Sequence, residues 1–147
     1  MWARIIRAAP ILAGVIVAAM APTNTESSEW PRIALSGYDP VAYFTVGYAA
    51  RGNQEYFYAW GDTLYQFATP AHRALFIAQP DRYAPQFSGY CALGVAEGYK
   101  VDADPEAWAI VNDRLYLTYN MRGREKLLAD PVTAIAGAEA GWKALAH

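Results

Sequence analysis

The order of apolar and polar residues predicts a β-hairpin and a following helix in the middle of the chain. The runs EYFYAW (55–60) and TLYQF (63–67) are rich in aromatic residues and flank the turn pair Gly61-Asp62, as in a hairpin. Thr69-Pro70 then suits a helix N-cap with proline at the first helical position, and Pro80 ends the helix. One stripe of this helix carries His72, Leu75, Phe76 and Gln79.

The same pattern recurs 51 residues later without a gap. AWAIV (107–111) and RLYLTY (114–119) flank Asn112-Asp113, Asn120 is a candidate N-cap, and Pro131 closes the second helix. Between residues 55 and 81, seven of 27 positions match their counterparts, where chance gives roughly one or two. The pattern favours a repeated unit; the alternative is that two hairpin-helix units share only their capping chemistry.

Weaker patterns predict the remaining elements. The β-branched and aromatic stretch Val41–Val46 predicts a first strand, and the Gly, Arg and Asn content of 47–54 predicts a loop. Ser88 is expected to cap a short helix over 89–97, with Gly98 as its left-handed C′ residue.

An Ala-rich stretch from Asp130 to Ala146 predicts a C-terminal helix. The expected fold is therefore α+β: a small antiparallel sheet built from two β-hairpins, each followed by a short helix, with the C-terminal helix packed on it. The apolar side of that helix carries Ala134, Ile135, Ala138, Trp142 and Leu145.

The first 21 residues resemble a secretory signal. Arg4 and Arg7 give a basic start, a 14-residue apolar run follows, and the small residues Ala19 and Ala21 offer two cleavage positions. The run is shorter than the ~20 residues that span a bilayer, so an uncleaved membrane anchor is the alternative. We expect export to the periplasm of a Gram-negative bacterium, with 1–21 as signal peptide, 22–36 as a flexible leader and 37–147 as one domain.

Composition and charge narrow the classes of partner. The chain of 147 residues is 54% hydrophobic, which suits one packed domain. Loss of the signal leaves 10 basic residues against 14 acidic ones, a net charge of −4. Such a protein has no basic field for nucleic acid, and membrane contact is expected only if the signal is uncleaved.

Two residues are the candidates for chemistry, Cys91 and His72. Cys91 is the only cysteine, and the third position of a Ser88-capped helix would stabilise its thiolate; the alternative is a small core residue beside Ala92 and Val95. His72 takes the third position of its own helix, which favours a neutral, metal-binding ring, or it is a hydrogen-bonded packing residue. With one interior histidine we expect no serine-type triad, and no enzymatic reaction is indicated.

Several motifs resemble the YHS domain family. They are GYDPVAYF (37–44), FATPAHRALF (67–76) and QPDRYAPQF (79–87), and the continuation SGYCALGVAEGYKVDADPEAWAIV (88–111) with LYLTYN (115–120) is similar to a subgroup of exported bacterial YHS proteins. The resemblance implies a relation to TRASH-like metal-binding domains and, in particular, to copper-handling proteins.

The family's metal-binding form has three cysteines at positions where this chain has Ala42, Ala68 and His72. Only His72 of these can bind a metal, so a site would have to combine His72 with Cys91, a donor pair that suits copper or zinc. The sequence thus predicts an exported copper- or zinc-binding module. The alternatives are a thiol redox protein that uses Cys91 with a partner protein, and a structural or binding module that has lost the metal site.

Overall fold

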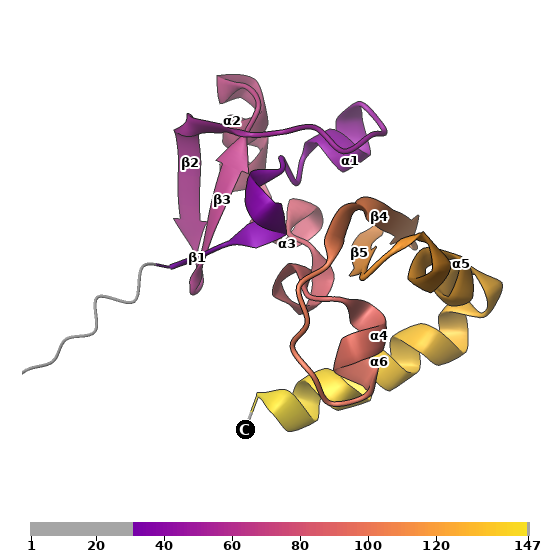
Figure 1. The fold of residues 1–147 in the computed structure, drawn as a ribbon. Coiled ribbons are helices and arrows are strands. Elements are labelled where there is room, and N and C mark those ends of the chain that lie inside the picture. Colours follow the sequence, from indigo (N-terminus) through magenta and orange to yellow (C-terminus); the bar gives the residue numbers. More distant parts are fainter. Residues whose placement is uncertain (1–30, 147) are drawn as a thin grey trace, which may run out of the picture.

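The computed structural model describes residues 31–146, and its first half is built on a hairpin (Figure 1). Strands β2 (Asn53–Trp60) and β3 (Thr63–Phe67) pair antiparallel around the turn at Gly61, which has a positive φ. The short strand β1 (Arg32–Ile33) adds to β3 in parallel and completes a three-stranded sheet.

The second hairpin forms a sheet of its own. Strands β4 (Asp104–Val111) and β5 (Arg114–Thr118) pair antiparallel, and Asn112 and Asp113 both take the positive φ that a tight hairpin turn requires. The α+β class with two antiparallel hairpins is therefore confirmed, with the hairpins in two small sheets rather than one.

Each hairpin is followed by the helix that its capping residues predict. Helices α2 (Pro70–Ala78) and α5 (Met121–Ala129) begin after Thr69 and Asn120, whose side chains accept hydrogen bonds from the third backbone N–H of each helix. Prolines start the next helices, α3 (Pro80–Tyr83) and α6 (Pro131–Leu145).

The expected strand at 41–46 is wrong, because this stretch contains helix α1 (Ala42–Thr45). The backbone N–H groups of Val41 and Ala42 donate to Oδ1 of Asp39, 2.8 and 3.3 Å away, and these bonds hold a helical turn. Capping by the neighbouring carboxylate of Asp39 thus outweighs the strand preference of the β-branched residues.

The expected Ser88 cap is also wrong. Ser88 lies in the 3-10 helix η2 (Gln86–Gly89) with a left-handed backbone (φ 54°), and helix α4 (Ala92–Ala96) starts only after Cys91. Cys91 is thus the N-cap residue of α4, not its third residue. Gly98 does take the left-handed conformation expected after that helix (φ 89°).

The fold starts earlier than residue 37. Beyond β1, Ala34 and Leu35 in the 3-10 helix η1 (Ala34–Gly37) are buried, so the last residues of the expected leader belong to the core. The expected signal peptide, 1–21, lies outside the described residues.

The repeat extends well beyond the two hairpins. We call residues 34–83 the first unit and 86–134 the second. Both units open with a 3-10 helix that holds two consecutive left-handed residues, and both carry an irregular register near the start of the longer strand. The predicted repetition is confirmed as a repetition of structure, at an offset of 52 residues before the first strand and 51 after it.

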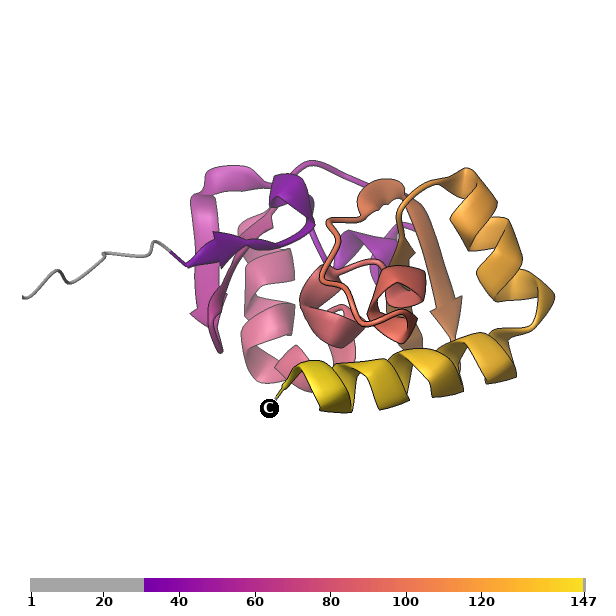
Figure 2. The ribbon, with the colours of Figure 1, turned by 60° about the horizontal axis from the view of Figure 1, so that its bottom comes forward.

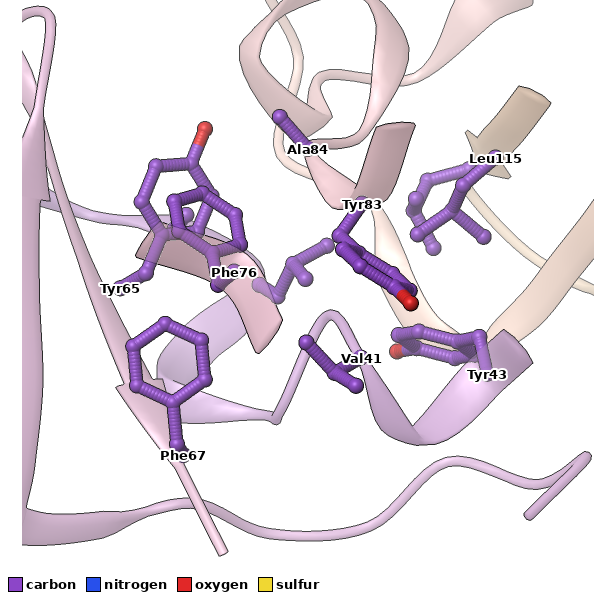
Figure 3. Close-up of a cluster of buried hydrophobic side chains, with 11 residues drawn as sticks. Val41, Tyr43, Tyr65, Phe67, Phe76, Tyr83, Ala84 and Leu115 are labelled. Atoms are coloured by element: carbon purple, nitrogen blue, oxygen red, sulfur yellow. The ribbon is translucent and has the colours of Figure 1, made fainter. Parts of the chain in front are cut away.

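Two clusters of buried side chains fill the molecule. The larger one joins the units, since Leu115 and Leu117 of β5 belong to it together with first-unit residues such as Phe76 and Tyr43. Figure 3 shows Leu115 among the first-unit side chains. The smaller one lies under α6, which runs along one side of the second unit and packs on α4 (Figure 2). All five residues expected on the apolar side of that helix belong to the smaller cluster: Ala134, Ile135, Ala138, Trp142 and Leu145.

Within residues 31–146, no helix combines the length and the apolar character needed to cross a bilayer.

Candidate functional site

In the first unit, a buried carboxylate holds the histidine that the sequence singles out. Asp39 is fully buried, and its Oδ2 lies 2.6 Å from Nδ1 of His72 and accepts the backbone N–H of Ala68 at 2.9 Å. Because Oδ1 caps α1, the carboxylate connects α1, the start of α2 and the loop between β3 and α2. We conclude that Asp39 is the polar centre of this unit.

The second ring nitrogen of His72 is also engaged. Nε2 lies 3.2 Å from Oγ1 of Thr45, and that hydroxyl is 3.1 Å from the carbonyl of Val41. The Asp39 carboxylate thus faces Nδ1 of the ring, and the Thr45 hydroxyl, which donates to the Val41 carbonyl, faces Nε2. Both ring nitrogens therefore have partners within the first unit, as expected if His72 is a hydrogen-bonded packing residue.

Cys91 occupies the second-unit position that corresponds to Asp39. The sequences SGYD (36–39) and SGYC (88–91) align at the 52-residue offset. The backbone N–H groups of Asp39 and Cys91 donate to the carbonyls of Ala50 and Val101, each at 2.8 Å. Cys91 is 3% exposed, so it is a core residue by burial, yet it is also one of the residues that line a pocket.

This pocket has a volume of about 420 Å³ and lies between α4 and α5. Its lining is mostly apolar and includes the charged residues Glu97, Arg122 and Lys126. The lining residues are Cys91, Leu93, Gly94, Glu97, Val101, Tyr119, Asn120, Arg122, Gly123 and Lys126.

One side chain that the first unit has is missing from the second unit at this pocket. Gly123 is the third residue of α5, the position of His72 in α2. In the first unit the imidazole extends from that position and reaches Asp39; in the second unit there is no side chain to reach Cys91. The two residues that the His72 ring faces, Asp39 and Thr45, correspond to the pocket residues Cys91 and Glu97, and Ala68, whose backbone N–H donates to Asp39, corresponds to Tyr119.

The structure gives the two predicted site residues different surroundings. His72 binds Asp39 and Thr45 in the first unit, whereas Cys91 lines the pocket of the second, whose lining does not include His72. Among residues 31–146 no group of three or more His, Cys, Asp or Glu side chains is arranged to hold a metal ion. A copper or zinc role for Cys91 and His72 stays a prediction.

Sequence reasoning missed Asp39 as the partner of His72, and Gly123 and Arg122 as parts of a pocket. The partner of His72 lies 33 residues away in sequence, and no local pattern connects the two. The available signal was the alignment of SGYD with SGYC, which pairs Asp39 with Cys91 but needs a change of offset from 51 to 52 residues.

Comparisons with protein-family models, curated proteins and solved structures give no match to this chain. The YHS resemblance therefore rests on the motifs alone and stays a prediction.

Proposed function

We propose that this protein is a binding protein for a small organic molecule, with the pocket of the second unit as its site and the Cys91 thiol in the binding surface. The observation that carries the proposal is that the only cysteine of the chain lines a mostly apolar pocket of about 420 Å³. Pockets of roughly 300–1,000 Å³ with an apolar lining and a few polar groups are typical of small-molecule sites.

Three charged residues of the lining can bind the polar part of a ligand. Arg122 and Lys126 lie on α5, and Glu97 follows α4. All three residues are exposed, and the ion pairs found among the described residues, Arg32–Asp102 and His72–Asp39, do not involve them. A ligand can therefore pair with them without first breaking an ion pair.

The proposal keeps Cys91 in a functional role without requiring a metal. A thiol in an apolar wall contacts a ligand by packing and by a weak S–H donor, and it is protected from solvent and from large reagents. If the predicted export holds, this protection also matters because an exposed thiol is oxidised in such a compartment.

The first experiment asks whether the pocket is the route to Cys91. Alkylation of Cys91 by iodoacetamide is followed by mass spectrometry in the full chain and in Gly123→Leu, whose side chain points into the space that His72 fills in the first unit. We expect alkylation to be at least about tenfold slower in Gly123→Leu, since the reagent must enter through the pocket.

Gly137→Ala is the matched control, because Gly137 lies on α6 and does not line this pocket. It should react as the unchanged protein does. Equal rates in Gly123→Leu and the unchanged protein would mean that Cys91 is reached only by unfolding, and the proposed site would be lost.

A further inference from the structure

The two units differ at the position of His72: the first unit places an imidazole there, whereas the second unit has Gly123 and a pocket beside it. In the first unit the ring of His72 lies between Asp39 and Thr45, with one ring nitrogen directed to each. In the second unit the corresponding residues are Cys91 and Glu97, and Gly123 takes the position of the histidine. The first unit is thus an internal example of what this backbone arrangement binds.

We propose that the pocket binds an imidazole ring that carries a carboxylate, with the ring in the place that the His72 side chain takes in the first unit. The inference rests on the proposed function and names the class of its ligand. The ring would lie against Gly123, one nitrogen would face the Cys91 sulfur and the other would face Glu97.

The chemistry of the two facing residues suits the two nitrogens of a neutral imidazole. Such a ring has one N–H donor and one acceptor nitrogen. The Glu97 carboxylate accepts the N–H, as a charge-assisted bond, and the Cys91 S–H donates to the other nitrogen. Glu97 stands where Thr45 faces Nε2 of His72, and Cys91 stands where Asp39 faces Nδ1. A benzene ring of similar shape can make neither bond.

The carboxylate follows from the charges on α5. Arg122 and Lys126 lie one residue before and three residues after Gly123, so a ring held against Gly123 has two cations beside it on the same helix. A carboxylate on the ring side chain pairs with these cations, whereas an ammonium in that place is repelled.

The experiment measures binding to the full chain by isothermal titration with four probes. Imidazole-4-acetate has the ring and the carboxylate, phenylacetate lacks the ring nitrogens, and 4-methylimidazole lacks the carboxylate. We expect imidazole-4-acetate to bind at least about tenfold more tightly than either of the other two, since each lacks one set of hydrogen bonds. The fourth probe, N-acetylglycyl-histidine, carries an imidazole and a carboxylate at the C-terminus of a short peptide. Its affinity, compared with that of imidazole-4-acetate, shows whether the pocket prefers a peptide or a free small molecule.

Variants locate the binding. Gly123→His supplies the ring from the chain itself and should abolish binding of imidazole-4-acetate. An added Cβ there lies 3.3 Å from the Cβ of Thr118 and 3.6 Å from Leu93, so Thr118 must shift by a few tenths of an ångström. Gly137→Ala should bind as the unchanged protein does. Arg122→Gln, an exposed change that leaves the core intact, should weaken imidazole-4-acetate and leave 4-methylimidazole unchanged.

Two results overturn the inference: equal binding of phenylacetate and imidazole-4-acetate, or full binding by a folded Gly123→His variant. Neither result changes the outcome of the alkylation experiment. The proposal of an imidazole ligand can therefore be wrong while the proposed pocket at Cys91 is right. If Gly123→Leu does not slow alkylation, the pocket itself is refuted and the ring assignment with it.

Discussion

At the scale of single residues, Asp39 is the polar side chain on which the first unit depends most. Its buried carboxylate accepts bonds from three backbone N–H groups and from His72. Removing it leaves those donors without a partner in the core, so Asp39→Ala should lower the free energy of unfolding by about 3 kcal/mol. Urea denaturation measures the change.

Asp102 offers the matched control for this prediction. Its side chain is 83% exposed and pairs with Arg32 at the surface. Asp102→Ala should therefore cost less than about 1 kcal/mol. Equal losses for the two variants would show that the carboxylate of Asp39 does not organise the unit.

The buried tyrosines make stability depend on alkaline pH. Burial raises the pKa of Tyr65 to about 12 and raises that of Tyr43 in the same direction, from an ordinary value of 10.0. The folded protein therefore keeps phenolic protons that the unfolded chain loses above pH 10, so stability falls between pH 10 and 12.

Tyr65→Phe should flatten this decline, by on the order of 2 kcal/mol between pH 9 and 12. Urea midpoints at a series of pH values measure it, with the neutral-pH midpoint of each protein as its own reference. Parallel pH profiles for the two proteins would remove Tyr65 as a contributor.

At the scale of elements, the contact between α4 and α6 depends on a glycine. A Cβ at Gly141 would run into the backbone carbonyl of Val95, so the two helices approach as closely as they do only because no side chain is present. Gly141→Ala should separate them and destabilise the protein by about 1–3 kcal/mol.

Gly137 lies one helical turn earlier on α6, and a Cβ there would meet only the Cβ of Ala96 at an ordinary 3.6 Å. Gly137→Ala should stabilise the protein by about 0.5–1 kcal/mol, since alanine favours a helix over glycine. Thermal unfolding compares the two variants, and effects of the same sign would contradict the proposed close approach.

Local signals predicted the elements whose ends are fixed by their own residues. The hairpin turns and the caps at Thr69 and Asn120 are correct because their chemistry acts over a few residues. The stretch 41–46 favours a strand by its β-branched and aromatic residues, and the carboxylate of Asp39 outweighs that preference; Asp39 is itself held by His72, 33 residues away in sequence. The pocket at Cys91 could not be predicted from the sequence either. Its lining includes Gly123, and the equivalence of Gly123 to His72 is visible only when the two folded units are compared.

At the scale of the whole molecule, the two units share one core and should unfold together. Leu117 of β5 is fully buried in the cluster that contains Phe76 of the first unit, and the Tyr43 hydroxyl donates to the carbonyl of Pro105 at 2.9 Å. The rings of Tyr43 and Trp108 lie 5.2 Å apart between their centroids. Neither unit can bury these side chains alone.

Leu117→Ala tests this coupling, because it removes second-unit atoms from a core that both units use. It should lower the opening free energy of the slowest-exchanging amides in β3 and in β5 by the same amount, about 2–5 kcal/mol, as measured by native-state hydrogen exchange. Val132→Ala, at a side chain that is 80% exposed, should change both by less than about 0.5 kcal/mol. Units that fold independently would instead lose protection in β5 while β3 keeps its value.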